Sequence, residues 1–246
     1  MDFVLNGVKV KNLFCNGVKV KKLYLNGVKV FGAEKIALTN SNYKMKTLYP
    51  DAYKTMTDFP TEDYVTSGLT SMLEMFSYCE AATSLDLTGF DTSKVTSMYS
   101  AFQFCRALTE IDLSYLDTSN LLYMGSMFWM CSSLKHINLT GFKTDKVTNM
   151  STLFSGCSAL TSLDLSSFDT SHVKGFSFMF SGCKNLAEIK GVIDLKSVDL
   201  RVASNGATYW NKMFEDCTKL TGVKIKNPPA GFDGAGLKPN QYTIVK

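Results

Sequence analysis

Residues 154–165 read Phe-Ser-Gly-Cys-Ser-Ala-Leu-Thr-Ser-Leu-Asp-Leu, and related stretches recur along most of the chain. The cysteine of this stretch recurs every 26 residues, and a sixth copy follows after 34, one period plus eight residues. Each copy lies three residues after a phenylalanine and three before a leucine or, once, an alanine. The copies are Cys79, Cys105, Cys131, Cys157, Cys183 and Cys217. A fixed period that carries the same apolar residues predicts stacked structural repeats.

Two apolar patterns alternate within each unit. Residues 147–154 place apolar side chains at three-four spacing, which predicts a short helix capped by Asp145. Residues 162–166 alternate polar residues with leucines, which predicts a short strand with its leucines inward. The sequence therefore predicts an α/β repeat solenoid, a leucine-rich repeat in which each 26-residue unit supplies a short parallel strand and a short helix.

Residues 1–31 carry a second repeat, in which Asn-Gly-Val-Lys-Val recurs every ten residues. Asn-Gly between β-favouring residues is a hairpin signal, because both residues accept the positive φ of a type I′ turn. The repeat predicts a small antiparallel β-hairpin module, a meander of about four strands that is too small to be stable alone. It is either a docking module or a cap on the first repeat. The candidate docking residues are Asn6, Gly7, Asn16, Gly17, Asn26 and Gly27.

The chain divides into four predicted parts. These are a hairpin-repeat docking module (1–31), a linker with the N-terminal cap (32–64), the repeat solenoid (65–226) and a C-terminal cap (227–246). In the N-terminal cap, Pro50 favours a short helix over residues 51–56. The eight extra residues before the last repeat predict an insertion loop, with Arg201 and Asn205 as candidate binding residues. A surface loop that binds nothing is the alternative.

Neither composition nor motifs suggest catalysis, a cofactor or a metal. The cysteines lack the paired spacing of a zinc site and are interpreted as buried free thiols, although disulfides between neighbouring repeats stay open. The histidines, His136 and His172, are expected at the surface without an adjacent nucleophile. We therefore expect no enzyme activity.

The net charge of +4 lies in the N-terminal segment. Residues 1–35 hold seven lysines against Asp2 and Glu34, which leaves 19 basic and 20 acidic residues in the rest of the chain. A near-neutral array without a basic stripe does not favour nucleic acid. No apolar run approaches the length of a membrane span, so membrane insertion is not expected.

The candidate binding surface is the outward face of the predicted strands. Its residues are Glu110, Asp112, His136, Asn138, Ser162, Asp164 and Glu188. Stacked carboxylates can hold a cation, but Asn138 interrupts their column and no acidic loop supports them. The face is therefore expected to offer a broad, preformed surface to a protein or glycan partner.

The unit from Cys157 to Phe180 resembles the BspA-like leucine-rich repeat of bacterial surface proteins, and the resemblance extends over residues 65–226. That family implies a right-handed solenoid with a parallel sheet on one face, a role in adhesion or binding, and no catalytic residues. The Asn-Gly repeat resembles hairpin modules near the ends of bacteriophage tail, baseplate and head-fibre proteins. The first residues lack a signal-peptide pattern, which fits a virion protein assembled in the host cytoplasm.

The sequence thus predicts a non-enzymatic bacteriophage virion protein, from the tail, baseplate or a head fibre, that displays a repeat surface for host attachment. It would contact other virion proteins through its N-terminal module, a host surface protein or glycan through the solenoid, and further copies of itself in the assembly. A bacterial cell-surface adhesin and a purely structural decoration protein of the particle are the alternatives.

Overall fold

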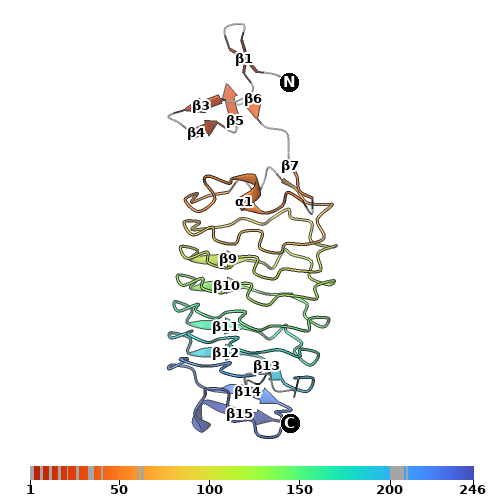
Figure 1. The fold of residues 1–246 in the computed structure, drawn as a ribbon, viewed down its shortest axis with the longest axis vertical. Coiled ribbons are helices and arrows are strands. Elements are labelled where there is room, and N and C mark those ends of the chain that lie inside the picture. Colours follow the sequence, from red (N-terminus) through yellow and green to blue (C-terminus); the bar gives the residue numbers. More distant parts are fainter. Residues whose placement is uncertain are drawn as a thin grey trace.

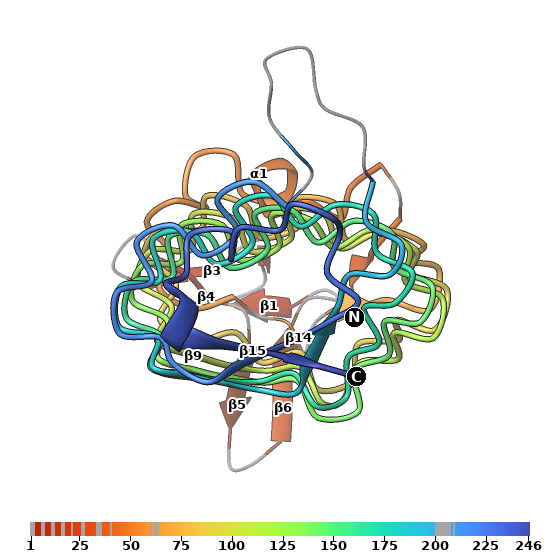
Figure 2. The same ribbon diagram turned by 90° about the horizontal axis from the view of Figure 1, so that it is seen from below.

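Most of the structure, a computed structural model, is a stack of similar coils that each correspond to one repeat (Figure 1). The residues described are 3–5, 8–10, 13–15, 18–20, 22–25, 28–32, 36–39, 41–59, 61, 64–199, 208 and 210–246. Seen along the axis of the stack, successive coils superpose closely (Figure 2). Repeated units with short parallel strands are therefore confirmed.

Three antiparallel hairpins precede the stack. Their strands are β1 (Phe3–Leu5) with β2 (Val8–Val10), β3 (Leu13–Cys15) with β4 (Val18–Val20), and β5 (Lys22–Leu25) with β6 (Val28–Gly32). The expected meander of about four strands is thus corrected to six strands in three two-stranded sheets. Each ten-residue unit is long enough to supply both strands of its own hairpin. The six Asn and Gly residues predicted to dock lie outside the described residues.

The N-terminal end of the stack is formed by β7 (Ile36–Ala37), α1 (Met45–Leu48) and β8 (Tyr64–Val65), with β7 parallel to β8. The helix predicted over residues 51–56 is wrong, because residues 51–55 form turns. The real helix ends before Pro50, since a residue that precedes proline is disfavoured in the helical conformation. In the described part of the chain, no helix is long and apolar enough to cross a membrane.

The strands of the stack pair in parallel. β9 (Glu110–Asp112) pairs with β10 (His136–Asn138), and β11 (Ser162–Asp164) pairs with β12 (Glu188–Lys190). The final sheet contains β13 (Val192–Asp194), β14 (Val223–Lys226) and β15 (Tyr242–Val245). The 3₁₀ turn η2 (Pro239–Gln241) comes directly before β15. The central residues of β9, β11 and β12 are buried and their neighbours are exposed, as the alternating pattern predicts. β15 pairs with β14 and ends the stack (Figure 2).

The helix predicted in each repeat is absent: no residue in 65–199 or 210–226 is helical. Alternate backbone N–H groups instead bond the next coil. The N–H groups of Glu74, Phe76 and Tyr78 donate to the carbonyl oxygens of residues 99, 101 and 103 at 3.0, 2.8 and 2.8 Å. The intervening N–H groups close short turns, such as Met75 to Met72 at 3.1 Å. A series of turns therefore produces the three-four spacing of apolar residues that predicted a helix. We call these segments the turn ladder, residues 71–79, 97–105, 123–131, 149–157 and 175–183.

The turn ladder places two residues of each coil in the left-handed region. These are Glu74 and Tyr78, Ser100 and Phe104, Ser126 and Met130, Thr152 and Gly156, and Phe178 and Gly182. A positive φ is what the third residue of a type II turn requires. Each residue other than glycine costs about 1–2 kcal/mol there. Hydrogen bonds between the coils, together with the packing of the core, must outweigh that cost.

The core is built from columns of identical side chains. The buried rings of the repeated phenylalanine stack with neighbouring centroids 5.3–5.7 Å apart and planes within 10° of parallel. These rings belong to Phe76, Phe102, Phe128, Phe154, Phe180 and Phe214. From the second repeat on, each repeated cysteine donates its thiol hydrogen to the carbonyl oxygen of the phenylalanine one coil earlier, at 3.1–3.2 Å. All six repeated cysteines are buried and free, so they bond the coils without disulfides.

A buried threonine provides a second link between coils. Thr144 Oγ1 donates to the carbonyl oxygen of Asp169 at 2.9 Å and accepts the Asp169 N–H at 2.8 Å. Equivalent threonines bond the following coil from the same position; they are Thr66, Thr92, Thr118 and Thr170. The Asp-Thr-Ser triplets that begin at Asp91, Asp117 and Asp169 form turns. Asp145, which was predicted to cap a helix, also lies in a turn and caps no helix. The role of the threonine could not be seen in the sequence.

Replacing Thr144 by valine should lower the free energy of unfolding by about 2 kcal/mol, because it leaves the part-buried N–H and C=O of Asp169 without the hydroxyl that bonds both. Thr144→Ser keeps the hydroxyl and loses only a methyl group, so it should cost about 1 kcal/mol. Urea unfolding of the two variants measures this difference. Equal stabilities would show that the hydroxyl does not hold the coils together.

The buried thiols should make the stack sensitive to alkali. Burial raises the pKa of the Cys131 thiol to about 12, against 9.0 for an unperturbed thiol. The contribution of this thiol to stability is complete below pH 9 and is lost as the pH rises toward 12, because only the unfolded chain ionises. Unfolding free energies measured above pH 9 should fall about 1.4 kcal/mol per pH unit less steeply in Cys131→Ala than in the unmodified chain. If the unfolding free energies of Cys131→Ala and the unmodified chain fall equally steeply with pH, the pKa of the Cys131 thiol is not raised by burial.

Candidate binding surface

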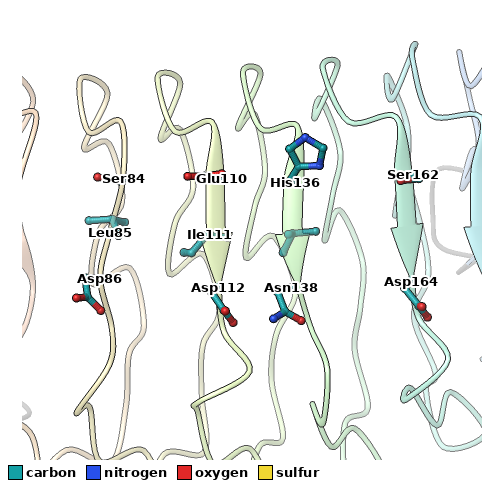
Figure 3. Close-up of a pocket in the computed structure, with 11 residues that line it drawn as sticks. Ser84, Leu85, Asp86, Glu110, Ile111, Asp112, His136, Asn138, Ser162 and Asp164 are labelled. Carbon is teal, nitrogen blue, oxygen red and sulfur yellow. The ribbon is translucent and has the colours of Figure 1, made fainter.

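The outward side chains of the strand face form two rows across four coils (Figure 3). One row contains Ser84, Glu110, His136 and Ser162, and the other contains Asp86, Asp112, Asn138 and Asp164. The parallel register places Glu110 beside His136 and Asp112 beside Asn138. Strand partners in such a register lie about 4.8 Å apart, so each row is a continuous set of polar groups.

The two rows border a shallow hollow of about 590 Å³. Its floor is lined by Leu85, Ile111 and Ile137, the residues between the two outward rows. Figure 3 labels Leu85 and Ile111 there. Leu85 and Ile111 are buried and Ile137 is half-buried, so the floor presents a limited apolar surface. The hollow therefore combines apolar contact at its centre with hydrogen-bonding groups on both sides.

The second row also stabilises the turns that follow the strands. Asp112 Oδ1 accepts the backbone N–H of Ser114 at 2.8 Å and its hydroxyl at 2.7 Å. Asp86 and Asp164 accept the N–H of the residue two positions on at 2.9 Å, and Asn138 does so at 3.1 Å. This is the local bonding of an Asx turn. One side-chain oxygen of each residue is thus used by the fold.

These bonds keep the aspartates of the row ionised. The hydrogen bond from the Ser114 hydroxyl is the largest cause that lowers the pKa of Asp112, and Asn138 lowers it further. The hydroxyls of Thr88 and Ser166 have the same effect on the pKa of Asp86 and Asp164. Together with Glu110, they give the hollow a negative potential at neutral pH. The face therefore suits a partner that presents hydrogen-bond donors.

The structure brings most of the predicted surface residues together. Six of the seven line the same hollow, namely Glu110, Asp112, His136, Asn138, Ser162 and Asp164. Glu188 is also exposed, but it lies in a neighbouring hollow of about 570 Å³ with Lys190 and Lys224. Ser84 and Asp86 line the other end of the hollow, at the repeat positions of Glu110 and Asp112. The column of outward residues expected from the sequence includes Asp86, whereas Ser84 was not predicted. The candidate loop residues Arg201 and Asn205 lie outside the described residues.

One cluster contains the residue types of a catalytic triad. The Ser171 hydroxyl lies 3.2 Å from Nδ1 of His172, and the Asp169 carboxylate lies 4.0 Å from the same nitrogen. A triad needs the serine and the acid on opposite ring nitrogens, so this exposed turn cannot relay a proton. Among the described residues, no group of three or more His, Cys, Asp or Glu side chains is arranged to hold a metal ion.

Comparison with known proteins places the array in one family. No curated protein and no solved structure matches the chain. A family model matches twice, over residues 43–139 and 107–227, and the overlap is what a repeating sequence produces. These matches cover more than half of the chain and are consistent with the BspA-like resemblance of its repeats. The chain therefore belongs to the family described as Mycoplasma protein of unknown function, DUF285.

Proposed function

We propose that this protein is a non-enzymatic binding protein whose leucine-rich-repeat solenoid presents the hollow of the strand face to a protein or glycan on a bacterial surface. The observation that carries the proposal is the hollow itself, where eight exposed polar side chains from four coils form two rows beside an apolar floor. Backbone bonds between coils hold these groups in place, so a partner meets a surface that needs little ordering.

The proposed setting is a bacteriophage virion, in the tail, the baseplate or a head fibre. The support is the N-terminal repeat, which forms three separate hairpins ahead of the stack, as a docking module would. Other virion proteins would bind the hairpins, further copies of the chain would lie beside it, and the coils would face the host.

A bacterial cell-surface adhesin is the second candidate. The match to a family described from Mycoplasma favours it, because that description names a bacterium and no virus. Both candidates use the same strand face, so the binding test applies to either.

The strand face can be tested with the purified chain and intact bacterial cells. Glu110→Ala combined with His136→Ala removes two adjacent polar groups from the hollow and should weaken cell binding at least about tenfold, as the loss of central interface groups does. Asp145→Ala combined with His172→Ala is the matched control, since both residues are exposed and lie outside the hollow. Equal binding by both pairs would refute the site. No binding by the unmodified chain would favour a structural decoration protein.

The virion setting can be tested by deleting residues 1–35. The shortened chain should be missing from phage particles while its coils unfold at the unchanged temperature, because the repeats bond one another. The full chain with Glu110→Ala and His136→Ala should still enter particles. Incorporation of the shortened chain, detected by immunoblot of purified particles, would show that the hairpins do not dock it.

A further inference from the structure

The outer surface of the turn ladder changes character halfway along the stack. Its first three coils carry five aromatic residues, which we call the aromatic face: Tyr78, Tyr99, Phe104, Tyr123 and Trp129. The next two coils carry only small or amide side chains at the same repeat positions, namely Asn149, Ser151, Ser155 and Gly156, then Gly175, Ser177, Ser181 and Gly182. Four of the aromatics are 36–51% exposed, and Phe104 is half-buried between two of them.

The fold does not need these aromatics. The N–H of Gly156 bonds Ser181 across coils at 2.7 Å, much as the N–H of Tyr78 bonds Gln103 at 2.8 Å. Tyr78 and Phe104 hold left-handed conformations, with φ of 62° and 59°, at the position where the fourth and fifth coils have Gly156 and Gly182. Met130 and Asp216 hold the same conformation at this position, so the fold accepts several side chains here and does not require an aromatic one.

The ring of Tyr99 packs closely over a glycine. A Cβ at Gly125 would lie 3.1 Å from the ring of Tyr99 and 3.3 Å from Oδ1 of Asn149, so only glycine allows both groups to approach this closely. Asn149 is also the bridge partner of Tyr123 on the neighbouring coil. The carboxamide of Asn149 therefore lies close to the ring of Tyr99 and beside the coil that carries Tyr123.

The other three aromatics form a continuous strip. The rings of Tyr78 and Phe104 stack with centroids 4.7 Å apart, and Trp129 lies 5.0 Å from Phe104. The guanidinium of Arg106 lies 5.0 Å over the Phe104 ring, and its Nε lies 3.7 Å from the Glu80 carboxylate. Arg106 and Glu80 thus pair with each other, while the ammonium of Lys54 lies 6.0 Å from the Tyr78 ring centroid and adds a positive charge at that end of the strip.

We propose that the aromatic face binds a neutral polysaccharide. Aromatic rings pack against the C–H faces of pyranose rings, while carboxamides and hydroxyls bond the sugar hydroxyls, and Asn149, Gln103 and Ser151 supply such groups here. Successive coils repeat about every 4.8 Å, close to the length of one pyranose unit, so a chain along the stack axis meets each coil in turn.

A protein partner fits this surface less well. Protein interfaces also use Trp, Tyr and Arg as anchors, but they set these residues in closely packed pockets from which water is excluded. No large aliphatic side chain is exposed among residues 71–131, all of which the structure describes. The face also lies half a coil from the hollow, since 13 residues separate Met98 from Ile111. It is a second site, and it does not depend on the function proposed for the first.

The full chain should be titrated with soluble hexasaccharides of β-1,4-linked glucose, β-1,4-linked N-acetylglucosamine and α-linked rhamnose. Trp129 is the reporter, because Trp210, the only other tryptophan, is buried and can be replaced by phenylalanine. We expect a saturable change in emission with at least one of these sugars and none with poly(glycerol phosphate). No response to any neutral sugar, or a response to the anionic polymer alone, overturns the proposal.

The repeats supply the variants. Tyr99→Ser with Tyr123→Asn introduces the residues of the fourth coil, Ser151 and Asn149, and it should weaken sugar binding at least about tenfold while leaving the melting temperature unchanged. Asp145→Ala with His172→Ala is the matched control, since both residues are exposed and lie outside both surfaces, and it should leave sugar binding intact. Tyr78→Gly with Phe104→Gly should keep or raise the melting temperature. A lower melting temperature in either aromatic variant, or unchanged sugar binding in the tyrosine variant, would overturn the proposal.

Discussion

Backbone hydrogen bonds between coils are the constraint on which the structure depends. Along the turn ladder, alternate N–H groups have their acceptor in the next coil, so a coil without a neighbour would leave these donors unsatisfied. Buried threonine hydroxyls and cysteine thiols add bonds in the same direction. Contacts in such an array are made between neighbours, and both ends must be covered. At one end Phe59 packs edge-on against Phe76, and at the other β15 pairs with β14.

The period and the inward face of each unit could be predicted from the sequence, whereas the helices could not be excluded. Leu163 and Leu165 are buried and alternate with polar residues, which a strand alone explains. Residues 147–154 have a spacing that fits both a helix and a series of turns. The deciding factor is where the N–H groups donate, and their acceptors lie 25 residues away in the chain. A glycine just after such a spacing is typical of a helix end, yet the positive φ of Gly156 belongs to the turn ladder.

Much of the strand face could be predicted from the alternation of leucines and polar residues, but the aspartates of this face have a second role. Asp112, Asn138 and Asp164 each precede a leucine and then a serine or threonine, and that pattern is the sequence signal for an Asx turn. Their bonded oxygens shape the strand ends and are not available to a ligand. Glu110 and His136 have no such bond in the structure of this face. Recognition therefore depends more on the first row than on the second.

The repeats allow one coil to serve as a comparison for another, because the backbone is shared while the surface residues vary. The strand face carries carboxylates from Asp86 to Asp164 and then lysines at 190 and 224. At the positions of the aromatic face, the turn ladder carries aromatics as far as Trp129 and then glycine, serine and asparagine, while the half-buried Phe178 lies at a different repeat position. Packing within the coils does not require either change, since the buried phenylalanine and cysteine columns continue through both. The surfaces with distinct chemistry thus share the N-terminal half of the stack. The later coils extend the core and let the chain end in a paired strand.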